Sequence, residues 1–193
     1  MPYRASELLV VFAMRDEAGG HFELLGVPLL YTGVGKVNSA YALTKRLTQF
    51  RPRLVLAFGT VGSKVFPVHT LVECTRFVQR DMDVSALGLP PGHTPFDDLP
   101  DVLEVPKRLA LPSATCASGD QFVAEESDAS GEVVDMEAYA LAKVCQREAI
   151  EFMAVKYVTD AAGSSAARDW TRNLTAAARH FLGVYRELTG QSP

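Results

Sequence analysis

Blocks of hydrophobic and polar residues alternate along the chain, and their spacing predicts strands and helices in turn. Short continuous apolar runs, which are typical of buried strands, occupy residues 8–14, 27–31, 53–58 and 152–158. Residues 70–79 alternate in the manner of a strand, and residues 109–116 form a weaker strand candidate. Apolar positions three or four residues apart, which favour amphipathic helices, follow in residues 37–50, 136–145 and 169–188. Strands that alternate with helices predict an α/β fold around a mixed, largely parallel sheet.

Two of the predicted helices are marked by their apolar residues. In the first helix the apolar positions are Val37, Ala40, Tyr41, Leu47 and Phe50. In the last helix the apolar face consists of Trp170, Leu174, Ala177, Phe181, Leu182, Tyr185 and Leu188. Trp170 stands near the start of its helix, so the sequence allows two locations for its side chain, in the core or in the wall of a pocket.

The most informative stretch is residues 133–145, where an apolar run passes through Asp135, Met136 and Glu137 into a helical pattern. In open α/β sheets the ligand crevice lies outside the carboxyl ends of the strands, which favours a binding role for these acids. Two solvated acids in a loop are the alternative. Polar residues or glycines also follow the other predicted strands, giving the set Glu17, Gly33, Thr60, Asp120, Asp135 and Asp160. If the strands are mostly parallel, we expect these ends to converge on one pocket.

Composition narrows the class of protein. The 193 residues predict a single domain, 1–193, that is large enough to bury a core. A net charge of -4 and scattered basic residues argue against nucleic acid as a partner. The apolar run 8–14 is too short to span a membrane and lacks the features of a signal peptide. Three widely spaced cysteines match no metal pattern, so we expect no metal, buried free thiols and a cytoplasmic location.

Seven segments, read in order, resemble the signatures of the nucleoside phosphorylase/nucleosidase superfamily. They are residues 13–17, 32–37, 58–63, 83–88, 118–123, 134–138 and 156–160. The pattern is most similar to the 5'-methylthioadenosine/S-adenosylhomocysteine nucleosidase branch and covers most of the chain. The resemblance implies a three-layer αβα fold with a central mixed, largely parallel sheet. It also implies hydrolysis of the N-glycosidic bond of a 5'-modified purine nucleoside, with release of adenine, in purine salvage.

The same resemblance implies two catalytic carboxyl groups. Asp160 would be the general acid that protonates purine N7, so that the base leaves from an oxocarbenium-like ribosyl centre. Glu17 would be the general base that activates the attacking water. An acid that donates a proton at neutral pH needs a raised pKa, whereas the base must stay ionised. The alternatives are a helix cap for Asp160 and a surface acid for Glu17, where Asp16 competes for the role.

Further positions are implied to bind the substrate, with Glu137 on the ribose hydroxyls, Met136 against the sugar and Phe122 stacked on the purine. The full set is Glu137, Met136, Phe122, Val123, Thr60, Val61, Gly62, Thr159, Trp170 and Asp135. Several positions depart from the family pattern. Trp170 replaces a phenylalanine, Lys156 an arginine and Asp135 a glutamate, and the chain is shorter than typical members.

Water or phosphate as the attacking group is the main open choice. Phosphorylases of this superfamily bind phosphate through arginines, one of which stands where this chain has Ala57. A phosphate dianion without cationic partners is poorly held, and Glu17 would repel it. Both points favour water, although Arg15 in the first loop could still serve phosphate.

Other functions remain open beside the nucleosidase. Within the superfamily these are a nucleosidase for futalosine, aminodeoxyfutalosine, 5'-deoxyadenosine or an adenosyl lipid, and a phosphate-dependent purine nucleoside phosphorylase. A non-catalytic nucleoside-binding protein is the alternative from another class, although binding alone would not need both an acid and a base. We expect a small-molecule purine nucleoside as partner and no cofactor. The resemblance implies a homodimer in which the loop near Leu87 closes over the neighbouring 5' pocket.

Overall fold

The computed structural model describes residues 2–123 and 131–191. Eight strands in these residues form one sheet. They are β1 (Leu8–Phe12), β2 (Leu29–Tyr31), β3 (Leu54–Gly62), β4 (Leu71–Gln79), β5 (Leu103–Glu104), β6 (Ser113–Ser118), β7 (Val133–Asp135) and β8 (Glu151–Asp160). The α-helices are α1 (Arg15–Ala18), α2 (Lys36–Leu47), α3 (Ala138–Arg147) and α4 (Ala166–Thr189). Short 3-10 turns occupy Ala5–Glu7, Glu23–Leu25 and Ser85–Leu87.

The sheet is mixed, with parallel pairs in the majority, as the sequence predicts. Strand β1 pairs in parallel with β2 and β3, β3 with β8, and β6 with both β4 and β7. Strand β4 runs antiparallel to β5 and β8. A single antiparallel pair, Gly62 with Val134, joins β3 to β7. These pairings close β3, β8, β4, β6 and β7 into a ring, whose parallel strands bring several carboxyl ends together.

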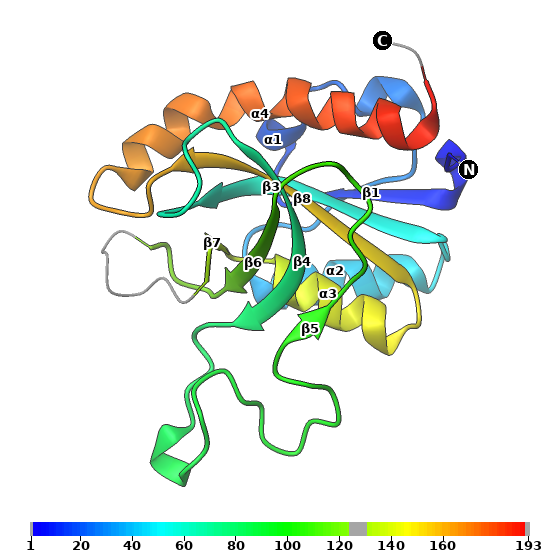
Figure 1. Ribbon diagram of the computed structural model, residues 1–193. Coiled ribbons are helices and arrows are strands. Elements are labelled where there is room, and N and C mark those ends of the chain that lie inside the picture. Colours follow the sequence, from blue (N-terminus) through cyan, green and yellow to red (C-terminus); the bar gives the residue numbers. More distant parts are fainter. Residues whose placement is uncertain (1, 124–130, 192–193) are drawn as a thin grey trace.

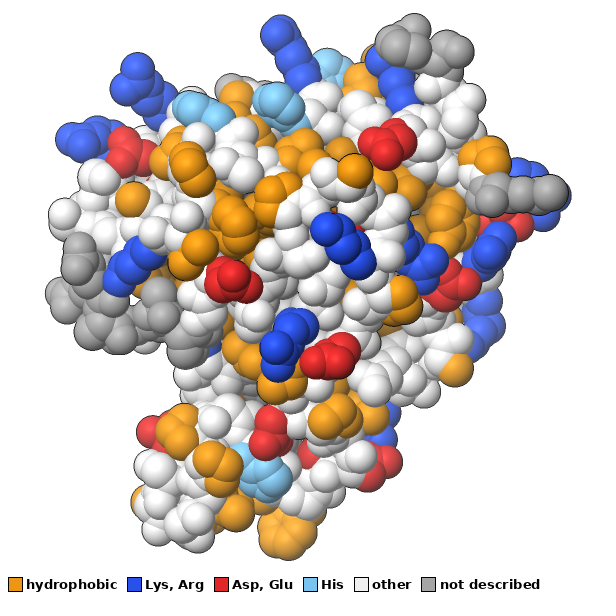
Figure 2. Space-filling model, viewed as in Figure 1, with side chains coloured by type: hydrophobic (Ala, Val, Ile, Leu, Met, Phe, Trp, Pro, Cys, Tyr) orange, Lys and Arg blue, Asp and Glu red, His pale blue; other side chains and the backbone are white. Residues whose placement is uncertain are grey.

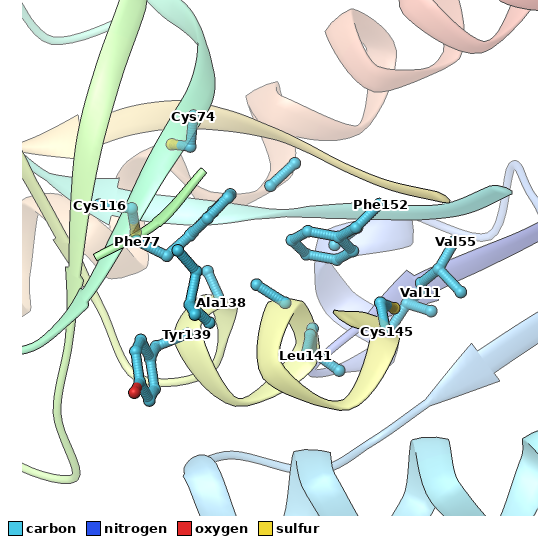
Figure 3. Close-up of a cluster of buried hydrophobic side chains, with 14 of the residues drawn as sticks. Val11, Val55, Cys74, Phe77, Cys116, Ala138, Tyr139, Leu141, Cys145 and Phe152 are labelled. Carbon is cyan, nitrogen blue, oxygen red and sulfur yellow. The ribbon is translucent and has the colours of Figure 1, made fainter. Parts of the chain in front are cut away.

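Helices cover both faces of the sheet, with α4 and α1 on one face and α2 and α3 on the other (Figure 1). An aromatic core of Phe12, Phe22, Phe58, Phe181 and Tyr185 lies beneath α4. A second core lies between the sheet and α3, where Phe77 meets Phe152 edge to face at 5.3 Å (Figure 3). This arrangement is consistent with the predicted three layers. No helix in the described residues combines the length and apolar character needed to cross a membrane.

The segment between β4 and β5 extends away from the sheet (Figure 1). Apolar side chains lie on the surface of this extension (Figure 2), and Leu87 and Phe96 are both exposed. The predicted lid residue Leu87 is therefore uncovered in a single copy of the chain.

Two details of the structure could not be read from the apolar pattern. Of the apolar positions in the first helix, Val37 and Tyr41 are 77% and 66% exposed, while Ser39 and Leu43 are buried. Ser39 tolerates burial because its hydroxyl donates to Gly35 O at 2.8 Å, so a polar residue takes the inward position. The strand predicted for residues 53–58 continues to Gly62 as β3, because residues 59–62 also pair with β8, with a shift of register between Val61 and Gly62.

Candidate functional site

A cavity of about 190 Å³ opens at the carboxyl ends of β3, β7 and β8. Its wall is largely apolar, with carboxylates at a few points. The lining consists of Ala13, Met14, Glu17, Val34, Thr60, Val61, Gly62, Arg80, Gln121, Phe122, Val123, Val134, Asp135, Met136, Glu137, Asp160 and Trp170.

The structure brings together every site residue named from the sequence except Thr159. Thr159 is fully buried behind the cavity wall, where its Oγ1 lies 2.9 Å from Asp160 Oδ2 and 3.2 Å from Val61 O. Its side chain supports Asp160 and lines no part of the cavity, in contrast to the expected place beside the base. The predicted convergence of strand ends is also incomplete, since neither Gly33 nor Asp120 lines this cavity.

Glu17 reaches the cavity from α1, a helix of one turn that follows β1. Its Oε2 accepts a hydrogen bond from Met14 N at 3.2 Å and so caps the helix to which it belongs. Its Oε1 accepts two bonds from Thr60, at 3.0 Å from the backbone N and 3.1 Å from Oγ1. Burial raises the pKa of Glu17, although the Lys156 ammonium and these hydrogen bonds act in the opposite direction.

Asp160 ends β8 in a different environment. Its Oδ1 accepts a hydrogen bond from Ala162 N at 2.9 Å. A Cβ added to Gly62 would lie 2.7 Å from Oδ1, so only glycine leaves room for the carboxyl group here. Burial raises the pKa of Asp160, and the negative charge of Asp169 also raises it, although the hydrogen bonds from Ala162 N and Thr159 Oγ1 act in the opposite direction. Protonation is therefore more favourable for Asp160 than for a carboxyl group at the protein surface.

Asp135 and Glu137 are the two remaining acids, and Asp135 forms a buried ion pair with Lys156 of β8. Lys156 Nζ lies 2.7 Å from Asp135 Oδ2, and both side chains are almost fully buried. Asp135 also accepts bonds from Ser118 Oγ at 2.5 Å and from Ala138 N at 3.0 Å, the latter at the start of α3. Burial alone would raise the pKa of Asp135, but the Lys156 charge holds it below its usual value.

Glu137 has fewer partners than Asp135. Its Oε1 accepts a hydrogen bond from Gly35 N at 2.9 Å, at the turn that precedes α2. Burial and then the neighbouring Asp135 raise the pKa of Glu137 to about 7. Because Asp135 is already held by Lys156, Ser118 and the α3 backbone, Glu137 is the better placed of the two to bind a ligand hydroxyl.

An aromatic pair lies on the cavity wall, with Phe122 after β6 and Trp170 on α4. Phe122 is 45% exposed at the mouth, where a flat ligand can reach its ring. Trp170 donates from Nε1 to Thr60 Oγ1 at 3.0 Å, which ties α4 to the Glu17 region. Val61 and Val123 complete an apolar surface suited to a purine.

Arg80 is the notable residue that sequence reasoning missed. It directly follows β4, lines the cavity, and donates from Nη2 to the carbonyl of Gln121. The strand-end rule applied to the other strands would have identified it. Arg15, by contrast, is 74% exposed and lies 3.5 Å from Glu23, outside the cavity lining.

The comparisons with known proteins agree with this geometry. The family model described as the phosphorylase superfamily matches residues 22–188. A 5'-methylthioadenosine/S-adenosylhomocysteine nucleosidase from Geobacillus thermodenitrificans is 30% identical over 195 residues, which cover 89% of this chain and 82% of the relative.

Solved structures give the same picture. The Helicobacter pylori 5'-methylthioadenosine/S-adenosylhomocysteine nucleosidase is 25% identical, with a TM-score of 0.83 over 93% of this chain and 97% of its own. The futalosine hydrolase of the same species is 24% identical, with a TM-score of 0.84 over 93% of this chain and 97% of its own, and shows the shared fold. With the family model matching most of its length and the strand ends meeting in one acid-lined cavity, the chain belongs to the phosphorylase superfamily.

Proposed function

We propose that this protein hydrolyses the N-glycosidic bond of a 5'-modified purine nucleoside of the methylthioadenosine or S-adenosylhomocysteine type, releasing adenine in purine salvage. The names of its relatives support this choice of substrate. The observation that carries the proposal is that Glu17 of α1 and Asp160 of β8 both lie against the carboxyl end of β3. Glu17 is hydrogen-bonded to Thr60, and Asp160 lies against Gly62, two residues further along β3.

Two residues of strand span about 7 Å, so the two carboxyl groups act on opposite parts of one ligand. A purine between Phe122, Trp170 and Val61 would present its N7 to Asp160, and the ribose would lie toward Glu17 and Glu137. Asp160 transfers its proton to N7, the bond between C1' and N9 breaks, and its electron pair moves into the base. Water then bonds to C1' while Glu17 takes the proton that water releases.

Water is favoured over phosphate because of the charges on the ribose side of the cavity. Glu17, Asp135 and Glu137 outnumber the single ammonium of Lys156, and Asp135 already pairs with it. A phosphate dianion would need uncommitted cationic donors at this point. Arg15, the arginine considered for this role, lies elsewhere.

Within the proposed substrate class, Arg80 favours a nucleoside whose 5'-substituent carries a carboxylate. Arg80 lines the cavity, its guanidinium bonds to backbone carbonyls, and its Nε is buried without a hydrogen-bond partner in the described residues. S-Adenosylhomocysteine, whose tail carries a carboxylate, has the chemistry to use this group, whereas methylthioadenosine does not. Arg80→Gln should then slow the first substrate more than the second.

We further propose a single three-layer αβα domain over residues 1–193 that works as a homodimer in the cytoplasm. Exposed apolar side chains at Val34, Val37, Tyr41 and Leu87 support a second copy, since such groups are disfavoured on a bare surface. Val34 also lines the cavity, so a partner would approach the site itself. The three buried cysteines suit a reducing compartment.

The test is release of adenine from methylthioadenosine, S-adenosylhomocysteine, 5'-deoxyadenosine and aminodeoxyfutalosine, each with and without phosphate. We expect release that ignores phosphate and is abolished in Asp160→Asn. A requirement for phosphate, with ribose 1-phosphate as product, would contradict hydrolysis. Tight binding without release would instead support a nucleoside-binding protein.

A further inference from the structure

Trp170 is joined to Glu17 by a short chain of hydrogen bonds. The indole Nε1 lies 3.0 Å from Thr60 Oγ1, and Thr60 Oγ1 lies 3.1 Å from Glu17 Oε1. These hydrogen bonds link the first turns of α4, the carboxyl end of β3 and the single turn of α1. Trp170 therefore forms part of the wall proposed for the purine and is connected, through Thr60, to the acid proposed to activate water.

The direction of each bond follows from which groups can donate. An indole N–H can only donate, so Thr60 Oγ1 accepts from Trp170. The hydroxyl has a single hydrogen, and with Trp170 occupying one of its lone pairs that hydrogen points to the Glu17 carboxylate. The indole N–H thus reinforces the orientation in which the Thr60 hydroxyl donates to Glu17, because it occupies an acceptor site on Thr60 Oγ1 and leaves the hydrogen directed at the carboxylate.

The two oxygens of Glu17 become unequal as a result. Oε1 receives both the Thr60 hydroxyl and the Thr60 backbone N–H, the latter at 3.0 Å. Oε2 receives one longer bond, from Met14 N at 3.2 Å. A proton added to Oε1 would face two donors, whereas Oε2 keeps a free lone pair. Oε2 is therefore the oxygen able to take a proton from water.

We infer that Trp170 is a positioning residue, which acts through the Thr60 hydroxyl to hold Glu17 with Oε1 saturated and Oε2 open to the attacking water. The inference rests on the proposed function, because it needs Glu17 to act as the base. A phenylalanine, which the family pattern has at this position, would form the same wall but could not donate this bond. The tryptophan at this position provides the same apolar surface and, in addition, an indole N–H that can donate a hydrogen bond.

The decisive experiment is a double-mutant cycle of Trp170→Phe and Thr60→Val on adenine release. Loss of one hydrogen bond that orients the base predicts a fall in kcat of roughly 3- to 10-fold for Trp170→Phe, with a smaller change in KM. In the Thr60→Val background the same change should lower kcat by less than about 2-fold. The reason is that the relay, meaning the hydrogen bonds from Trp170 through Thr60 to Glu17, is already broken. Independent, multiplying losses would overturn the inference and leave Trp170 as a wall residue only.

Two further variants separate positioning from packing. Thr60→Ser keeps the hydroxyl and should retain most of the activity. Thr171→Val removes a hydroxyl from the adjacent residue of α4, where it bonds only to Ala167 O, and should leave kcat unchanged. A kcat loss in Thr171→Val equal to that in Trp170→Phe would show that helix packing, and not the relay, is responsible.

A second readout does not depend on turnover. Infrared titration of the Glu17 carboxyl, assigned by subtraction of Glu17→Gln, should give a higher pKa in Trp170→Phe, since a donor to the carboxylate has been weakened. Lys156 on β8 and Glu137 before α3 also act on Glu17 and are unchanged in these variants. If the pKa of Glu17 rises in Trp170→Phe but the unaltered protein releases no adenine, the proposed function is rejected and the relay from Trp170 to Glu17 is retained. An unshifted titration would reject the relay.

Discussion

The Glu17 end and the Asp160 end of the cavity hold the same chemical group in opposite surroundings. Glu17 is bonded to N–H and O–H donors from α1 and β3 and feels the positive charge of Lys156. Asp160 feels the negative charge of Asp169 and accepts bonds from Ala162 N and Thr159 Oγ1. Both acids are buried, and burial raises both pKa values.

The difference indicates how one cavity can hold an acid and a base. Burial raises the pKa of both carboxyl groups, so the division of roles must come from their neighbours. The cation near Glu17 favours its charged form, whereas the anion near Asp160 favours its neutral form. The following changes test whether this contrast is the working difference.

The largest effect is expected at the Asp160 end. Asp160→Asn should lower kcat for adenine release from methylthioadenosine by about 10²–10⁴-fold, because the base must be protonated to leave. The same variant should hydrolyse 4-nitrophenyl riboside within about 10-fold of the unaltered rate, since nitrophenolate leaves without a proton. Steady-state kinetics on both substrates provides the measurement. Equal losses on the two would remove the acid role from Asp160.

Glu17→Gln should show the complementary pattern. We expect a loss of about 10²–10³-fold on both methylthioadenosine and 4-nitrophenyl riboside, because each reaction needs an activated water. Parallel assays of the two variants compare the ends of the cavity directly. If Glu17→Gln spared the nitrophenyl substrate, the contrast between base and acid would fail.

The cation that distinguishes the Glu17 end can be removed by Lys156→Met. Asp135 would be left buried without its partner, so we expect a loss of about 3–5 kcal/mol in the free energy of unfolding. The matched control is Lys143→Met, which removes a partly exposed ammonium from Asp97 but leaves that carboxylate paired with Arg147, and which should cost less than about 1 kcal/mol. Denaturant titration of both variants gives the comparison, and similar losses would show that the Lys156 pair contributes nothing special.

Stability should depend on pH through Glu137, whose pKa in the folded protein is about 7. An acid whose folded pKa is raised binds more protons in the folded than in the unfolded state, so its ionisation opposes folding. Its unfavourable contribution is absent below its unfolded pKa near 4.5 and grows until the pH passes 7. We expect the unligated protein to lose on the order of 1–3 kcal/mol over this window relative to Glu137→Gln. Parallel slopes for the two proteins in pH-dependent denaturation would exclude the effect.

The smallest effect is expected for Arg15→Ala. Arg15 is exposed, packs over the Tyr31 ring at 4.7 Å and lies outside the cavity lining. Adenine release, with or without phosphate, should stay within about 2-fold of the unaltered rate. A change in phosphate dependence would show that the ribose side can recruit this arginine.

Local patterns predicted most of the elements but not how they face one another. The apolar runs located β1 and β8, and the acids that follow the predicted strands include Glu17, Asp135 and Asp160. The spacing of apolar residues located α2 but did not show that Val37 and Tyr41 are exposed while Ser39 is buried. The rotation of α2 is set by contacts at its start, where Gly35 N bonds to Glu137 and Lys36 N bonds to Asp120 at 2.7 Å. These partners are far away in the sequence.

The sequence by itself determined the alternation of strands and helices, the family pattern and the types of side chain at the strand ends. These follow from local spacing, since side-chain direction repeats with the period of each element. Only the tertiary structure decided that Thr159 lies behind the wall, that Arg80 and not Arg15 lines the cavity, and that Trp170 reaches Glu17 through Thr60. Such contacts depend on the pairing of β3 with β8 and on the packing of α4, which bring residues more than one hundred positions apart within hydrogen-bond distance.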